Sequence, residues 1–217
     1  MSARVGVVRF LGTNCDRDLW QAAEGAGLKP EWLWYEDNFE TMDYAALLIP
    51  GGFSYGDYLR CGALAARTPV MKSVRKAAQQ GVPILGICNG FQVLCEAELL
   101  PGALLPNQSG RFVDAWVELK LENSKDSWAS GRPGSSVYLP VAHGDGRYHI
   151  NEEGLKAIED RGQIWWRYSK NPNGSVADIA GVSDPSGKVV GLMPHPERAV
   201  AEWMGGQDGL QFFKEIS

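Results

Sequence analysis

Short apolar runs alternate with stretches of helical periodicity along the first half of the chain. The runs are bounded by glycine, proline and polar residues, as buried strands are. The predicted strands lie at residues 5–10, 32–35, 45–49 and 83–87. The predicted helices lie at residues 16–27, 63–80 and 91–100. Thr68-Pro69 divides the second of these helices, because the residue before a proline avoids the α region.

Strands that alternate with helices predict right-handed βαβ units. We therefore expect an α/β fold with a mostly parallel central sheet flanked by helices. In such sheets, ligands bind beyond the C-terminal ends of the strands. Functional residues are expected where a strand passes into the following loop or helix.

The second half of the chain is richer in strands, and we expect these to add antiparallel strands to the sheet. Gly- and Asn-rich turns, such as Pro172-Asn173-Gly174, separate several of them. The predicted strands lie at residues 113–121, 136–141, 163–168, 175–182 and 188–192. Residues 209–216 predict a terminal helix, and the Ser-, Gly- and charge-rich segment 124–136 is expected to be mobile. Without a repeat or a low-complexity linker, residues 1–217 are interpreted as one domain.

Composition supports one globular domain and excludes several functions. The 217 residues are 44% hydrophobic and 22% charged, with a net charge of −5, so nucleic acid and anionic membranes are not expected partners. No apolar run approaches the roughly 20 residues that cross a bilayer, and no secretory signal is recognisable. The cysteines show neither disulfide nor metal-binding spacing, so we expect reduced thiols, a cytoplasmic protein and no metal. They are Cys15, Cys61, Cys88 and Cys95.

Gly86-Ile87-Cys88-Asn89-Gly90 lies between a predicted strand and a predicted helix. This is the arrangement of a nucleophile elbow, here G-x-C-x-G. Cys88 would lie at a helix N-terminus, where free N–H groups and the helix dipole favour the thiolate. Gly86 and Gly90 would leave room for neighbouring backbone and a substrate. The alternative is a buried structural cysteine, the usual state of a free cysteine.

His195 is the histidine with the strongest catalytic context of the three in the chain. It lies in Pro194-His195-Pro196-Glu197, directly after a predicted strand. Residues two apart in an extended segment point the same way, so His195 and Glu197 can approach each other. A carboxylate in that position orients the imidazole and stabilises its charged form. The alternative is a surface turn in which both side chains meet only water.

Two further segments could complete a site. A thiolate that attacks a carbonyl needs donors for the oxyanion, and the N–H of Asn89 is suitably placed. The glycine-rich loop 50–57 follows the strand 45–49 and could supply a second donor, or could be an ordinary turn. His143 begins the turn His143-Gly144-Asp145-Gly146-Arg147-Tyr148, which could meet a ligand or partner, or only solvent.

Six strings together resemble the class I glutamine amidotransferase family. They are GTNCDRD (12–18), PGGFSYGDYLRCGALA (50–65), GICNGFQ (86–92), NQSGRF (107–112), HGDGRY (143–148) and MPHPERA (193–199). The longer strings are similar to one branch of that family, the glutaminase subunits of phosphoribosylformylglycinamidine synthases in purine biosynthesis. Leu11 stands where that branch has proline, and Asp145 where glutamate is commoner.

The resemblance implies a flavodoxin-like single domain and a role for each matching residue. Cys88 would attack the side-chain amide of L-glutamine and release ammonia, with His195 moving the proton and Glu197 orienting His195. Backbone groups of Gly52 and Asn89 would hold the oxyanion. The glutamine would be recognised by Gln92, Phe53, Ser54, Asn107 and Ser109.

The resemblance also implies partners for the chain. No P-loop and no dinucleotide fingerprint occurs, so no cofactor is expected on this chain. A separate synthetase subunit would bind ATP, Mg and formylglycinamide ribonucleotide and receive the ammonia, and a small third subunit would join the complex. Two alternatives remain: a stand-alone cysteine hydrolase, of the γ-glutamyl hydrolase or peptidase type, and a thiol sensor without enzymatic activity.

Overall fold

A central sheet with helices on both faces organises the protein. The computed structural model describes residues 2–125, 127–128 and 131–216. In this part of the chain, the strands of the central sheet are β1 (Arg4–Arg9), β2 (Lys29–Trp34), β3 (Ala46–Ile49), β4 (Ile84–Ile87), β6 (Val113–Leu121), β7 (Ser136–His143), β9 (Ile164–Tyr168), β10 (Ile179–Ser183) and β11 (Val189–Leu192). A small second sheet pairs β5 (Ala103–Leu105) with β8 (Arg147–His149).

The helices connect these strands. The α-helices are α1 (Asp16–Gly25), α2 (Val70–Gln79), α3 (Asn89–Glu96), α4 (Glu152–Asp160) and α5 (Gln211–Lys214). The single 3₁₀ turns are η1 (Thr41–Asp43), η2 (Ser54–Asp57), η3 (Ala65–Arg67), η4 (Val176–Asp178), η5 (Pro196–Arg198), η6 (Glu202–Met204) and η7 (Asp208–Leu210). No helix of the described residues is both long and apolar enough to cross a bilayer.

The central sheet changes character halfway across. Its order is β2-β1-β3-β4-β11-β10-β9-β6-β7, and the pairs from β2 to β11 are parallel. The pairs from β11 to β7 are antiparallel. The predicted α/β fold is confirmed, with the parallel region built by the first half of the chain and β11. The antiparallel strands of the second half extend this sheet.

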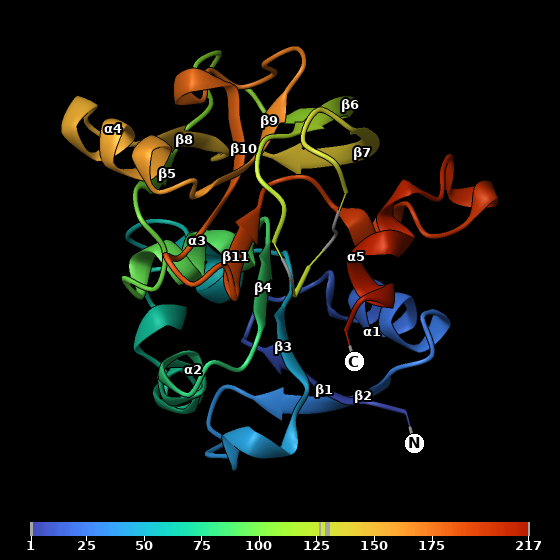
Figure 1. Ribbon diagram of the computed structural model, residues 1–217. Coiled ribbons are helices and arrows are strands. Elements are labelled where there is room, and N and C mark those ends of the chain that lie inside the picture. The colour runs from blue at the N-terminus through green and yellow to red at the C-terminus, as the bar shows by residue number, and fades with distance from the viewer. Residues whose placement is uncertain (1, 126, 129–130, 217) are drawn as a thin grey trace.

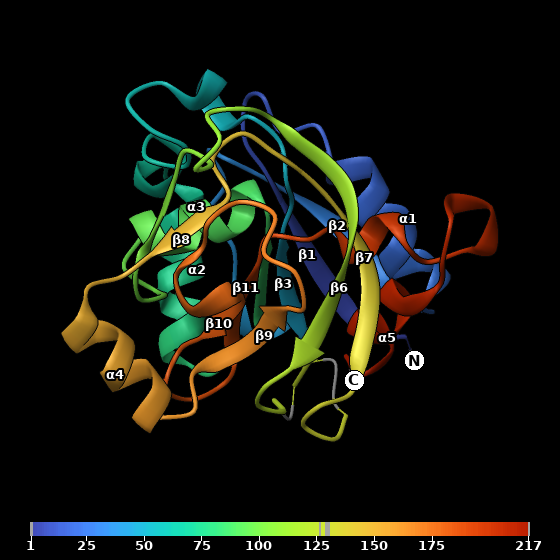
Figure 2. The same ribbon diagram turned by 90° about the horizontal axis from the view of Figure 1, so that it is seen from above.

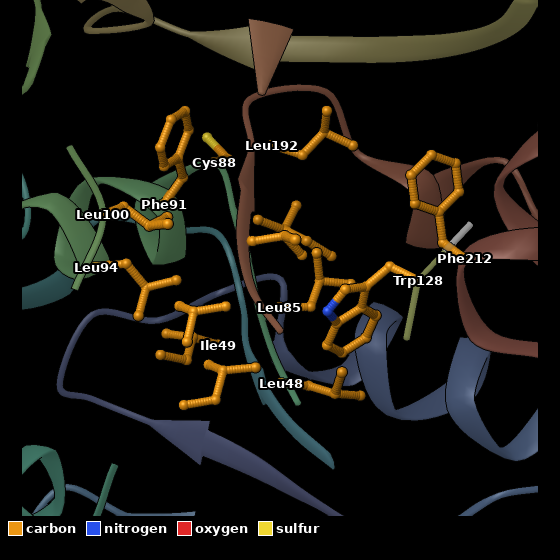
Figure 3. Packing of buried hydrophobic residues seen from close by; sticks show 14 of the residues in the cluster. Leu48, Ile49, Leu85, Cys88, Phe91, Leu94, Leu100, Trp128, Leu192 and Phe212 are labelled. Carbon is orange, nitrogen blue, oxygen red and sulfur yellow. The ribbon is translucent and has the colours of Figure 1, made fainter. Parts of the chain in front are cut away.

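Helices cover both faces of the parallel region, and Figures 1 and 2 agree on their placement: α2 and α3 lie on one face, α1 and α5 on the other. Every residue of β3, β4 and β11 is buried, since both faces of these strands are covered. Figure 3 shows Phe91, Leu94 and Leu100 on one side of β4 and β11, and Trp128 and Phe212 on the other. Because β4 is packed on both faces, its C-terminal end is held in place, and Cys88 directly follows that end.

Most predicted elements are present, with some corrected boundaries. Pro69 separates η3 from α2, as predicted. The predicted helix 91–100 instead begins at Asn89 and ends at Glu96, because Glu98 has a left-handed φ of 59°. The predicted strand 175–182 begins as the turn η4, and the predicted terminal helix is the turn η7 followed by α5. Of the segment 124–136, residues 126, 129 and 130 lie outside the described residues.

One α-helix and two strands were not predicted. Helix α4 is preceded by the N-cap Asn151, whose side chain accepts a hydrogen bond from the Gly154 N–H at 2.8 Å. That cap is a sequence signal for the helix. Strands β5 and β8 are only three residues long and are separated by a long stretch of sequence, so local periodicity could not reveal them.

Candidate active site

Cys88 lies in the sharp turn between β4 and α3. Its φ of 50° and ψ of −107° are unusual for a residue with a side chain, and its N–H donates to the Leu192 carbonyl at 2.8 Å. Such strain persists only where surrounding structure enforces it. A Cβ added to Gly90 would overlap the Ile49 carbonyl, and one added to Gly86 would lie 2.7 Å from Gly90. The predicted sharp turn between strand and helix is therefore present, and the two glycines leave room for neighbouring backbone and side chains.

His195 and Glu197 form a buried pair. His195 Nδ1 lies 2.6 Å from Glu197 Oε1, and the two residues are 1% and 0% exposed. The His195 N–H donates to the Pro140 carbonyl at 2.8 Å, which anchors it to β7. The predicted approach of the two side chains is confirmed, but the predicted reason is wrong. Glu197 lies in the 3₁₀ turn η5 rather than in an extended segment.

Cys88 and His195 border the same space above Gly51. A Cβ at Gly51 would lie 2.8 Å from His195 Cε1 and 3.3 Å from Cys88 Cβ. Glycine at this position thus leaves room between the thiol and the imidazole. His195 Nε2 is buried and forms no hydrogen bond with the described residues, so it is free to exchange a proton with a group in this space.

The charge of His195 is controlled by its neighbours. Burial acts against the charged ring, but the negative charges of Glu197 and of ionised Cys88 outweigh burial and raise the pKa of His195 well above its ordinary value. The site therefore favours a positively charged His195 ring. An imidazolium next to the sulfur is the partner that a cysteine nucleophile requires.

The loop after β3 approaches the elbow and carries Gly52. The Phe53 N–H donates to the Gly12 carbonyl at 3.1 Å, and the Cys15 N–H donates to the Gly51 carbonyl at 3.3 Å. These bonds hold the loop against the N-terminal segment that follows β1. Asn89 is the first residue of α3, so its N–H has no partner within the helix. Gly52 lines the same cavity as Cys88, and Asn89 directly follows Cys88 in the chain.

A cavity of about 340 Å³ opens at this point of the fold. Five residues predicted for the site line it: Cys88, His195, Gly52, Phe53 and Gln92. Lining residues that the sequence did not assign to the site are Asn14, Cys15, Asp57, Cys61, Phe112, Ala142, His143, Gly144, Asp145 and Arg198. All of these except Ala142 lie in the six strings quoted above, and those strings are the signal that could have indicated them.

Gln92 is fixed between two segments. Its Nε2 donates to the Asp145 carbonyl at 2.6 Å, and its Oε1 accepts from Asn89 Nδ2 at 2.8 Å. Gln92 lies one helical turn beyond Cys88 and is buried. Its side chain therefore joins the first turn of α3 to the turn between β7 and β8.

Three residues predicted to bind glutamine do not line the cavity. Ser54 is buried, and its N–H donates to Asn89 Oδ1 at 3.1 Å. Asn107 Nδ2 donates to the carbonyls of Arg111 and His143, each at 2.9 Å, and its Oδ1 accepts the Gly146 N–H at 3.0 Å. The side chain of Asn107 is thus bonded to the 143–146 turn and to the backbone of Arg111. Ser109 lies beside a different hollow and accepts the Arg111 N–H at 3.3 Å.

His143 is a neutral, buried histidine at the cavity wall. Its Nδ1 lies 3.1 Å from Asn107 Oδ1, and its Nε2 lies 3.4 Å from Asn173 Nδ2. Burial, and then the charge of His195, lowers the pKa of His143 to about 4. The ring therefore positions the turn that carries Asp145 and does not compete with His195 for the thiol proton.

The depressed pKa of His143 predicts acid sensitivity. The unfolded chain binds a proton at His143 below the ordinary pKa of 6.5, whereas the folded chain does not until about pH 4. The stabilisation that the neutral ring contributes is fully present above pH 6.5 and decreases as the pH falls toward 4. When the pH is lowered from 7.5 to 5, we expect the free energy of unfolding to fall by about 2 kcal/mol more in the wild type than in His143→Gln. Urea unfolding at both pH values measures this, and equal losses would contradict it.

Cys15 lies beside the His195–Glu197 pair. The side chains of Cys15, His195 and Glu197 each offer one atom that could bind a metal ion, and these atoms lie within 4.8 Å of one another. In the part of the chain that the structure describes, this is the one cluster of three such side chains. The Cys15 sulfur also accepts from Arg198 Nη2 at 3.2 Å, and Arg198 Nε contacts Asp18 at 3.0 Å. A metal ion held here would occupy the imidazole and carboxylate that a catalytic triad needs.

Comparison with known proteins shows the family of the chain. The model of the CobB/CobQ-like glutamine amidotransferase domain family matches residues 2–208. In a structure of PurLQS from Thermotoga maritima, a chain is 46% identical, with 100% of this chain and 98% of that chain covered at a TM-score of 0.90. A glutamine amidotransferase from Thermotoga maritima is 19% identical, and the match covers 92% of this chain and 78% of that chain at a TM-score of 0.59. A glutamine amidotransferase from Methylobacillus flagellatus is 18% identical, and the match covers 100% of this chain and 88% of that chain at a TM-score of 0.56. These last two proteins share the fold of this chain.

Proposed function

The chain belongs to the family of CobB/CobQ-like glutamine amidotransferase domains, and we propose that Cys88, His195 and Glu197 are the triad with which it releases ammonia from L-glutamine. The observation that carries this proposal is the buried 2.6 Å contact of His195 with Glu197, beside Cys88 at the strained turn. The protein acts as the glutaminase subunit of a phosphoribosylformylglycinamidine synthase. The six matching strings and the 46% identity over the full chain support this branch.

The first half of the reaction breaks the amide bond. Cys88 Sγ attacks the side-chain carbonyl carbon of glutamine, after His195 Nε2 has taken the thiol proton. His195 then gives this proton to the departing nitrogen, which leaves as ammonia. Glu197 holds Nδ1 throughout, so that the ring keeps its orientation and its positive charge is stabilised. The product on the enzyme is a glutamyl thioester on Cys88.

The second half regenerates the enzyme. His195 takes a proton from water, the resulting hydroxide attacks the thioester carbonyl, and the Cys88 sulfur leaves to be reprotonated. Both steps pass through a tetrahedral intermediate with a negative oxygen. The N–H groups of Gly52 and Asn89 stabilise that oxygen, and loss of one such donor typically costs about 3 kcal/mol. Gln92 and Phe53 border the bound substrate from the cavity wall.

The ammonia is consumed by a partner. We assign ATP, Mg and formylglycinamide ribonucleotide to a synthetase subunit, and we expect a small third subunit in the complex. Exposed apolar side chains near the cavity support docking there: Phe53 is 46% exposed, Tyr58 74%, Leu59 85% and Phe112 54%. All four cysteines are free, which fits a reducing compartment, and we place the protein in the cytoplasm.

A reconstitution experiment tests the proposed function. The chain is purified with a candidate synthetase, and glutamine hydrolysis is measured with and without ATP and the ribonucleotide substrate. We expect slow hydrolysis by the isolated chain and stimulation in the complex, because the partner covers the exposed mouth of the cavity. Rapid hydrolysis by the isolated chain that no synthetase alters would instead favour a stand-alone hydrolase.

Glu197→Gln tests the orienting carboxylate. Without the negative charge, the proton on His195 is held less tightly, so both limbs of the pH profile of kcat/KM should move to lower pH. We also expect kcat/KM to fall roughly 10- to 100-fold at neutral pH, less than for loss of the nucleophile. The matched control is Glu24→Gln, which removes the same charge from an exposed position on α1. An unmoved pH profile would exclude Glu197 from this role.

A further inference from the structure

One part of the cavity is lined by acidic side chains that the triad does not use. Asp57 and Asp145 lie there with Gln92 and Cys61. We propose that Asp57 and Asp145 together bind the α-ammonium group of the substrate, so that the site accepts a free amino acid and rejects acylated or peptide-bound glutamine. This inference rests on the proposed glutaminase function and assigns the residues that select the substrate.

The two aspartates converge on the first turn of α3. Asp57 Oδ1 accepts a long hydrogen bond of 3.5 Å from Asn89 Nδ2. The backbone carbonyl of Asp145 accepts from Gln92 Nε2 at 2.6 Å. Asn89 and Gln92 belong to the first turn of α3, which directly follows Cys88. The segments that carry both aspartates therefore contact the helical turn next to the nucleophile, and both aspartates line the cavity that Cys88 lines.

The two carboxylates lack a cation. Neither takes part in an ion pair among the residues that the structure describes, and Arg198 in the same cavity is paired with Asp18. Within the described ranges, the side chain that donates to Asp145 is Cys61, whose sulfur lies 3.1 Å from Oδ2 and is a weak donor. Burial raises the pKa of Asp57, the hydrogen bond with Cys61 opposes this, and the charge of Asp145 adds to it. A bound cation would relieve this repulsion.

An ammonium group fits this demand better than a neutral group. It carries one positive charge and three N–H donors, which two carboxylates and a nearby carbonyl can accept. An acylated nitrogen has no charge and one donor, and it would leave both carboxylates partly desolvated and unpaired. The site should therefore discriminate against such substrates strongly, as buried polar groups without a partner are costly.

The backbone that presents Asp57 is held in an uncommon conformation. Tyr55, Asp57 and Leu59 have φ values of 55°, 56° and 70°, in the left-handed region. For residues with a side chain, this backbone conformation is strained. Strain of this kind is retained where it places a functional side chain. Here it places Asp57 at the cavity wall.

Covalent labelling of Cys88 tests the inference without requiring turnover. The probes are the chloromethyl ketone analogue of L-glutamine and the same ketone without the α-amino group. In the full chain, Asp57→Asn and Asp145→Asn should each slow alkylation of Cys88 by the amino-bearing probe about 10- to 100-fold. Alkylation by the probe without the amino group should stay within about twofold of wild type. The rates are followed by intact-protein mass spectrometry.

The control and a second measurement separate this inference from the proposed function. Asp114→Asn removes an exposed negative charge from β6 and should change neither rate. In the complex with the synthetase, the two cavity variants should raise KM for glutamine far more than they lower kcat, with no such change for glutaramate, which lacks the amino group. Equal losses for both probes, or no loss for either, would overturn the inference. Triad-dependent glutamine hydrolysis would then still support the proposed function.

Discussion

Cys88→Ala is expected to lower glutamine-dependent activity of the complex roughly 10⁴-fold or more, because the covalent route has no other nucleophile. Alanine tolerates the backbone of this turn about as well as cysteine does, so the variant should fold. Synthesis from added ammonia should continue at the wild-type rate, since the synthetase does not use the thiol. The two rates are measured in the same preparation, with glutamine and then with an ammonium salt.

Cys95→Ala is the matched control for that variant. Cys95 lies on α3, two turns beyond Cys88, and its sulfur contacts the Pro101 carbonyl at 3.7 Å, away from the cavity. This substitution should leave glutamine-dependent activity within about twofold of wild type and reduce stability by about 1 kcal/mol. Normal glutamine-dependent activity of Cys88→Ala would show that the nucleophile is assigned to the wrong residue.

Gly51→Ala is expected to lower kcat/KM for glutamine roughly 100-fold. The added methyl group would lie 2.8 Å from His195 Cε1, 3.1 Å from Cys15 Sγ and 3.3 Å from Cys88 Cβ. The imidazole or the elbow must move to relieve the first contact, and displacement by about 1 Å from the reactive geometry costs on the order of 10²-fold. The φ of Gly51 is not in the left-handed region, so the effect is one of space and not of backbone strain.

Gly25→Ala provides the comparison for Gly51→Ala. Gly25 is the last residue of α1, and an added Cβ would meet no atom within 4 Å. Activity should be unchanged, and stability should rise by up to about 1 kcal/mol because alanine favours the helix. Steady-state kinetics and thermal unfolding of both variants, measured side by side, check this pair. Unaltered activity of Gly51→Ala would mean that thiol and imidazole do not need the space above this glycine.

The part of the active site that could be predicted from sequence is the part built by neighbouring residues. The apolar run before Cys88, the glycines at positions 86 and 90 and the helix after them are contiguous, so their local geometry follows from the residues themselves. His195 and Glu197 are two positions apart and could be paired for the same reason. The prediction of an extended geometry was wrong because Pro196 begins a 3₁₀ turn, which also brings the two side chains together.

Less could be predicted where several loops meet. Asn107 is predicted to bind glutamine, and in the structure its side chain bonds to the 143–146 turn and to the Arg111 carbonyl and does not line the cavity. Asp57 and Asp145 were not assigned to the site, although they lie in strings that the sequence analysis quoted. Cys61 and Asp145 are 84 positions apart and touch only because β3, α3 and β7 place their loops at one end of the sheet.

The amino-acid sequence by itself determined the alternation of strands and helices, the sharp turn at Cys88 and the residues from which a site for acyl transfer is proposed. These depend on backbone preferences and side-chain chemistry within a few positions of the chain. Only the tertiary structure decided which loop residues face the thiol and which support the cavity from behind. That choice depends on the order of the strands in the sheet and on packing between distant segments, which local sequence preferences do not specify.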